Sequence, residues 1–233
     1  MPLQSQPLPT EPPLGCSFVR ATGGAEPSET ILTALRSHVR TQGDQVAYTF
    51  LKSDDERQTI TYRQLDERAR SIAQQLLRSA QPGDRALMTY PAGLEFIEAF
   101  LGCLYAGIVA VPAYPPKKNR NAERVLAIAH DCEPRLILCT AETRSYVQGE
   151  FAAAIKGAEV LLTDEIGTGS GSGLPDITAD CLAILQYTSG STADPKGVMV
   201  SHGNIAANER LIQKYFDFNH TSVMISWLPC FTT

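Results

Sequence analysis

The chain has 233 residues, of which 43% are hydrophobic and 19% charged, with 17 glycines and 15 prolines. This composition is that of a globular protein and excludes a collagenous or low-complexity chain, and the length predicts one or two domains. The formal net charge is −5. That charge argues against broad nucleic-acid binding and against a polybasic membrane anchor, because both depend on an excess of Lys and Arg.

No secretory signal is visible, because the N-terminus lacks a basic start followed by an apolar stretch. The longest uncharged run, residues 99–116, is long enough to span a membrane but contains two glycines and three prolines. It predicts the end of a helix, a glycine stop and a buried strand, and no membrane segment. The six cysteines include no C-x-x-C pair, which predicts reduced, mostly buried thiols in a cytoplasmic protein: Cys16, Cys103, Cys132, Cys139, Cys181 and Cys230.

Residues 1–29 hold six prolines and little periodicity, which predicts a flexible lead. From residue 30 onward, apolar residues at helical spacing alternate with short apolar runs. Thr61 and Gln64 form a capping-box pattern before a helix whose apolar face runs over 65–77. Further helices are predicted at 31–39, 94–106, 122–132, 151–156 and 204–216, and strands at 46–51, 85–90, 108–113, 135–140, 159–163, 181–187, 198–201 and 223–228.

Strands that are apolar throughout and alternate with helices predict an α/β fold with mostly parallel sheets covered by helices on both faces. A glycine- and serine-rich segment, residues 167–175, separates two of these strands. It is tempting as a dinucleotide-binding pattern, but the third glycine is missing and no strand–helix context surrounds it. We therefore expect a mobile linker there.

The informative segment is 183–198, where an apolar strand runs into small hydroxyl residues followed by Lys196. Successive backbone N–H groups and hydroxyls can donate to phosphate oxygens, and a lysine adds positive charge. The segment is not a common P-loop, because Pro195 stands at the second glycine position and Gly197 follows the lysine. By composition alone, such a cluster is more often an ordinary loop.

The string Tyr-Thr-Ser-Gly-Ser-Thr-x-x-Pro-Lys-Gly-Val at 187–198 resembles the phosphate-binding signature of the acyl- and aryl-adenylate-forming enzymes. Ala193 departs from it where glycine is common. The resemblance covers about residues 30–231, and segments 111–120, 185–186 and 226–231 are similar to fatty acyl-AMP ligases in particular. It implies that residues 30–233 are the N-terminal part of the large adenylate-forming domain.

The resemblance implies that ATP and a fatty acid give a fatty acyl-adenylate and pyrophosphate. The acyl group would then pass to the phosphopantetheine thiol of an acyl carrier protein. Mg²⁺ would bridge phosphate oxygens, and no catalytic residue or protein metal ligand is assigned. By position in the motif, the residues that would hold the ATP phosphates are Thr188, Ser189, Gly190, Ser191, Thr192 and Lys196.

Two other functions stay open, an acyl-CoA synthetase and a non-catalytic remnant that binds nucleotide. His202 is assigned no catalytic role. The sequence His130-Asp131-Cys132 has metal-ligand residue types, but adjacent residues on a helix point in different directions, so it predicts a helix end.

The family pattern usually continues with His-Asp after a segment such as 227–231, whereas this chain reads Thr232-Thr233. The resemblance therefore implies that the later adenine, Mg²⁺ and ribose motifs and the small C-terminal domain with its catalytic lysine are missing. We expect a truncated domain from an interrupted or frameshifted gene, with little or no activity. We also expect it to fold poorly alone, because strand 223–228 would leave an apolar edge.

Overall fold

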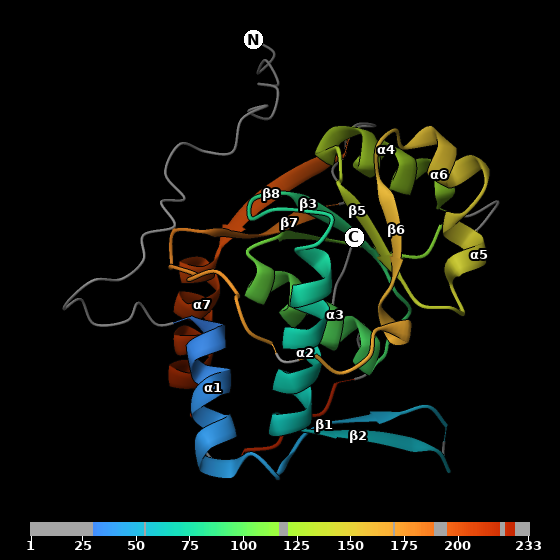
Figure 1. Ribbon diagram of the computed structural model, residues 1–233. Helices are drawn as coiled ribbons and strands as arrows, with labels where there is room; N and C mark the ends of the chain where they lie inside the picture. The colour runs from blue at the N-terminus through green and yellow to red at the C-terminus, as the bar shows by residue number, and fades with distance from the viewer. Residues whose placement is uncertain are drawn as a thin grey trace.

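The computed structural model describes residues 30–53, 55–116, 121–169, 171–188, 195–219 and 222–226, so the predicted lead at 1–29 lies outside it. A six-stranded sheet forms the centre of the molecule (Figure 1). Its first five strands are parallel and the last runs antiparallel to its neighbour. In spatial order the strands are β6 (Glu159–Leu162), β5 (Leu136–Cys139), β3 (Arg85–Thr89), β4 (Val109–Ala113), β7 (Leu182–Thr188) and β8 (Lys196–Ser201).

Helices cover both faces of this sheet, which confirms the predicted α/β class. On one face lie α2 (Tyr62–Leu76) and α3 (Leu94–Ala106), with α1 (Ile31–Gln42) packed outside them. On the other lie α4 (Ala122–Cys132), α5 (Arg144–Val147) and α6 (Glu150–Ala154). The last helix, α7 (His202–Tyr215), lies beside α1 (Figure 1), and a short 3-10 turn, η1 (Thr163–Glu165), follows β6.

The parallel strands read as apolar throughout because each is buried on both faces. In β3, Ala86 and Met88 pack with α2 and α3, whereas Leu87 between them packs with α4. All three side chains are fully buried. Burial on both sides is the usual state of a parallel strand, so these runs were recognisable as strands from composition.

The start of α2 and the end of α3 are stabilised by the local interactions that the sequence predicts. The Thr61 hydroxyl accepts from the Gln64 backbone N–H at 3.2 Å, and the Gln64 side chain accepts from the Thr61 N–H at 2.9 Å. Gly107 ends α3 in the left-handed conformation, with φ of 67°, and β4 follows. The run 99–116 is therefore a helix end, a glycine stop and a strand as predicted, and in the described ranges we find no helix with the length and apolarity to cross a bilayer.

The buried-thiol prediction is confirmed for the four cysteines that the structure describes. Their thiols are free and buried, and burial raises the pKa of Cys103, Cys132 and Cys139 to about 12. Cys16 and Cys230 lie outside the described residues.

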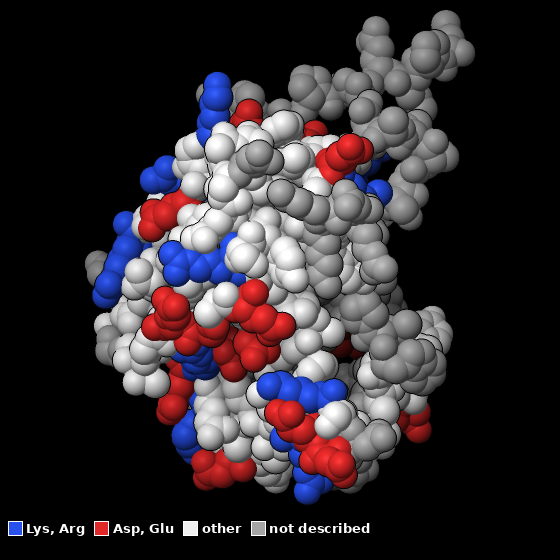
Figure 2. Space-filling view, turned by 90° about the vertical axis from the view of Figure 1, so that its right-hand side faces the viewer, with Lys and Arg blue, Asp and Glu red and all other residues white. Residues whose placement is uncertain are grey.

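Charged side chains of both signs are interspersed on the face shown in Figure 2. One ion pair of the fold is partly buried. The Arg68 guanidinium on α2 lies 3.0 Å from the Glu98 carboxylate on α3. It also donates to the carbonyl of Thr163 at 2.6 Å and to that of Ile166, so one side chain joins two helices to the segment after β6.

The structure departs from the predicted strands in two places: one strand was not predicted, and one predicted strand is not formed. A separate two-stranded antiparallel sheet pairs β1 (Val46–Leu51) with β2 (Arg57–Thr61), and β2 was not predicted because its residues are mostly polar. A strand was predicted at 223–228, but residues 222–226 form no helix or strand, and Val223 and Ile225 are exposed. A strand needs a neighbour for its backbone hydrogen bonds, and no described strand pairs with this segment. Trp227 and Leu228 lie outside the described residues.

The glycine-rich segment 167–175, predicted to be a mobile linker, is hydrogen-bonded to α2 in the part that the structure describes. It connects β6 to β7 across the width of the sheet and lies along α2. The Gly169 N–H donates to the Ser71 hydroxyl at 2.8 Å, and the Gly171 N–H donates to the Gln74 side chain at 3.0 Å. Polar side chains of α2 thus satisfy backbone groups of the segment, a partnership that its own composition does not reveal.

Gly171 provides a test of this attachment. Its φ is +59°, and an added Cβ would lie 2.6 Å from Nε of Arg70, whose guanidinium donates to the Gly171 carbonyl at 2.6 Å. We expect Gly171→Ala to lower the free energy of unfolding in urea by about 1 to 3 kcal/mol, because it combines backbone strain with a clash. The control is Gly167→Ala, where nothing lies within 4 Å. Equal effects of the two variants would contradict the attachment.

His202, the first residue of α7, is a buried histidine without a polar partner. Its side chain is 1% exposed, and neither ring nitrogen has a hydrogen-bond partner among the described residues. Burial lowers the pKa of His202 to about 4. The ring is therefore neutral at pH 7.

This depressed pKa predicts a pH dependence of stability. Between about pH 6.5 and pH 4 the unfolded chain binds a proton at His202 that the folded chain does not, so stability is lost as pH falls through this window. From pH 7 to pH 4.5 the loss from this group is about 2 to 3 kcal/mol. We expect His202→Phe to remove that part of the loss in urea unfolding, whereas His130→Gln, at an exposed position on α4, keeps it. A His202→Phe chain with the wild-type pH dependence would refute this explanation.

Candidate active site at the β7–β8 connection

The predicted phosphate-binding segment connects two adjacent antiparallel strands. β7 ends at Thr188, β8 begins at Lys196, and these two residues are opposite partners in the ladder. The structure thus brings the first and last predicted site residues together at the mouth of the connection. The four predicted residues between them lie outside the described residues: Ser189, Gly190, Ser191 and Thr192.

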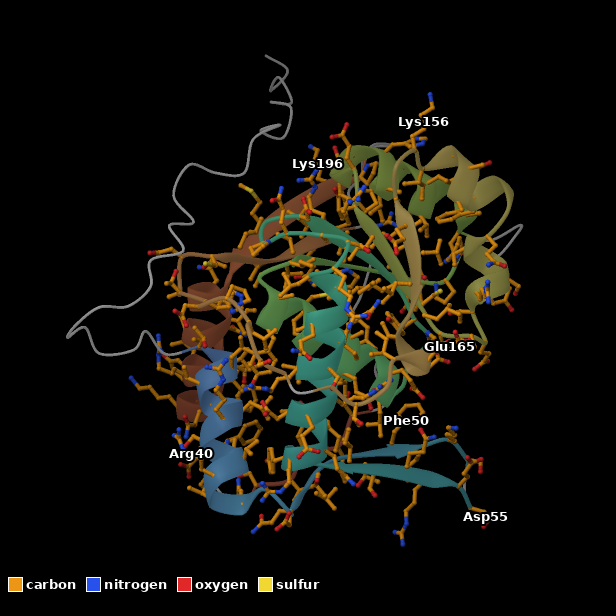
Figure 3. The ribbon with its side chains drawn as sticks, in the orientation of Figure 1. Arg40, Phe50, Asp55, Lys156, Glu165 and Lys196 are labelled. Carbon is orange, nitrogen blue, oxygen red and sulfur yellow. The ribbon has the colours of Figure 1, made fainter. Side chains whose placement is uncertain are left out.

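Thr188 and Lys196 have their side chains on the same face of this hairpin, because directly opposed residues of an antiparallel pair share a face. Both residues are exposed, as are Gln186 and Val198, the next residues on that face. Figure 3 shows Lys196 at the start of β8, at the end of the molecule where α4 lies and far from the β1–β2 hairpin with Asp55. A hydroxyl and an ammonium group are therefore presented together to solvent.

The ammonium group of Lys196 makes no ion pair with the described residues. Within the ranges that the structure describes, the ion pairs join other residues, and no carboxylate lies within ion-pair distance of Lys196. A cation and a hydroxyl, separated in the sequence by small residues, are suited to phosphate oxygens, which take charge-assisted hydrogen bonds from several donors.

On the opposite face of the hairpin, β7 is buried at Tyr187, whereas Met199 on β8 is exposed. Tyr187 is fully buried, and its hydroxyl donates to the Asp131 carboxylate on α4. Its ring lies against Gly197, the residue opposite it on β8, where an added Cβ would be 3.0 Å from Cζ of the ring. Burial, and next the hydrogen bond to Asp131, raise the pKa of Tyr187, so its hydroxyl stays protonated and acts as the donor.

The contact between Tyr187 and Asp131 was not predicted from the sequence. Asp131 was considered only within the sequence 130–132, which the structure shows as the end of α4, as predicted. His130 Nε2 lies 3.3 Å from the carbonyl of Ala154, so His130 and Asp131 have separate partners. Glycine within a strand often marks a close approach of another group, and Gly197 directly after the motif lysine was the available signal.

The segment after β4, singled out for its similarity to fatty acyl-AMP ligases, leaves the sheet as an irregular bend. Residues 114–116 have no regular structure, and the Asn121 side chain donates to the Pro115 carbonyl at 3.2 Å, which ties the bend to the start of α4. Residues 117–120 lie outside the described residues.

Comparison with known proteins agrees with this architecture. Residues 35–233 match a protein-family model described as AMP-binding enzyme. The chain is 37% identical over 211 residues to a medium-chain-fatty-acid–[acyl-carrier-protein] ligase, JamA, of Moorena producens (strain JHB), which covers 87% of this chain and 36% of that protein. It is 33% identical over 213 residues to the long-chain-fatty-acid–AMP ligase FadD32 of Mycolicibacterium smegmatis, covering 87% of this chain and 34% of that protein.

A similar solved structure is that of the fatty acyl-adenylate ligase from L. pneumophila in complex with acyl adenylate and pyrophosphate. It aligns with a TM-score of 0.79 and 35% identity, covering 86% of this chain and 35% of that one. The chain thus spans about a third of the length of these relatives. It belongs to the AMP-binding enzyme family, and fatty acid–AMP ligases are among its homologues.

Proposed function

We propose that the β7–β8 connection holds the phosphates of ATP, and that the chain serves the activation of a fatty acid as a fatty acyl-adenylate. The observation that carries this proposal is the placement of Thr188 opposite Lys196 at the mouth of a connection rich in hydroxyl residues. The unpaired state of Lys196 within the described residues supports it.

The roles of the chain's own groups follow from their chemistry. The Lys196 ammonium would offset charge on non-bridging phosphate oxygens. The hydroxyls of Thr188, Ser189, Ser191 and Thr192 would donate to those oxygens, and Gly190 would let the backbone approach closely. In the reaction a fatty acid carboxylate attacks the α-phosphorus and pyrophosphate leaves, so the rate depends on alignment and on charge stabilisation rather than on a protein nucleophile.

A magnesium ion would reach this site with the nucleotide. It would be held by phosphate oxygens and, when bound, would neutralise part of their charge. Among the described residues there is no group of three or more His, Cys, Asp or Glu side chains able to hold a metal.

The proposal also names the substrate, a fatty acid, and the acceptor of the acyl group. The names of JamA and FadD32 support a fatty acid substrate, and that of JamA supports an acyl carrier protein as the acceptor. An acyl-CoA synthetase differs only in the accepting thiol, so a transfer assay that offers both thiols separates the two. A nucleotide-binding remnant would bind ATP without fatty-acid-dependent pyrophosphate exchange.

The ATP contact is tested by titrating the purified chain with ATP and Mg²⁺ in a calorimeter. We expect saturable binding that Lys196→Ala weakens about tenfold or more, because it removes a charged donor. The matched control is Lys156→Ala, an exposed lysine at the same end of the molecule (Figure 3), which should leave the dissociation constant unchanged. Equal affinities of wild type and Lys196→Ala would contradict the proposal.

A further inference from the structure

We propose that Tyr187 and Asp131 are positioning residues for the ATP phosphates, acting by fixing the register that places Thr188 opposite Lys196. This inference rests on the proposed ATP site and adds two residues to it that do not touch the nucleotide. The observation behind it is the hydrogen bond from Tyr187, which lies on β7 one residue before Thr188, to Asp131 on α4.

The pairing register of β8 depends on a contact outside the β7–β8 ladder. β8 is an edge strand, bonded within the described residues to β7 alone, and its ladder with β7 has an irregularity between Leu182 and Ile184. Because side chains alternate along a strand, a slip of one residue would move Lys196 to the opposite face from Thr188. The site would then lose its paired hydroxyl and ammonium groups.

The Tyr187 ring selects the observed register by its size. It faces Gly197, where a Cβ would lie 3.0 Å from Cζ and 3.2 Å from the hydroxyl oxygen, so the ring would have to shift to admit a side chain. A slip in either direction would place Lys196 or Val198 opposite the ring instead of Gly197. Either residue would put a side chain into the space that the ring fills.

The hydrogen bond to Asp131 keeps the ring in that space. Asp131 lies in the last turn of α4, and this end of the helix is itself held to the central strand β3. There the Arg85 guanidinium donates to the carbonyls of Cys132 and, at 3.2 Å, of Glu133. The Tyr187 hydroxyl is thus anchored through α4 to the middle of the sheet, and β8 is set relative to that anchor.

The chain contains a matched control for this contact. Tyr105 on α3 is also fully buried, and its hydroxyl also donates to an aspartate, Asp66 on α2. That pair lies on the other face of the sheet, within the cluster formed with α2 and α3. Removing its hydroxyl tests the cost of losing such a bond without touching the hairpin.

The experiment measures the ATP dissociation constant and the urea unfolding of the full chain with five substitutions. We expect Tyr187→Phe and Asp131→Ala each to weaken ATP binding about three- to tenfold, and the double variant to be no weaker than either, because one bond is lost in each case. Asp131→Asn keeps an oxygen acceptor and should bind nearly as wild type. Tyr105→Phe should be destabilised to a similar degree with its ATP affinity within twofold of wild type. Gly197→Ala should weaken ATP binding as well.

Three results would overturn the inference. One is unchanged ATP affinity in Tyr187→Phe while Lys196→Ala binds weakly, which would leave the proposed function intact. Another is an equal loss of affinity in Tyr105→Phe, which would make the effect one of general stability. The last is an absence of ATP binding by the wild type, which would remove the proposed function together with this inference.

Discussion

The antiparallel pairing of β7 with β8 is the constraint on which the candidate site depends. It turns two residues on either side of a connection into neighbours, Thr188 and Lys196, with their side chains on one face. The opposite face of the same hairpin is filled by Tyr187 against Gly197. One ladder therefore separates the face that carries Thr188 and Lys196 from the face where Tyr187 connects to α4, and a change in its register would alter both.

The rest of the sheet gives this hairpin a rigid base. β3, β4 and β5 are buried on both faces between two layers of helices, and β7 joins them through β4. The segment from β6 to β7 has to cross the sheet, and polar groups of α2 hold it along the way. The exposed end of the hairpin is thus attached to strands that are buried on both faces, while the proposed phosphate contacts lie at the connection.

Local signals in the sequence predicted most of the fold. They missed the mostly polar strand β2 and the contacts between residues far apart in the chain. Apolar runs predicted the parallel strands because those strands are buried on both sides, and Thr61 with Gln64 predicted the start of α2. The attachment of Gly171 to Gln74 and the bond from Tyr187 to Asp131 join residues 97 and 56 positions apart. No spacing rule for a single element reveals such pairs. At the site, Thr188 and Lys196 were predicted and are found together, whereas the roles of Ser189, Gly190, Ser191 and Thr192 stay predictions.

The central claim is that Lys196 contacts ATP phosphate, and an acyl-phosphate derivative of ATP tests it directly. In this reagent a lysine amine close to the phosphates attacks the mixed anhydride, takes the acyl group as an amide and releases ATP, and peptide mass spectrometry then locates the modified residue. We predict acylation of Lys196 well above that of the exposed Lys156, with suppression by excess ATP. Equal labelling of the two lysines, or labelling of Lys196 that ATP does not suppress, would contradict the claim.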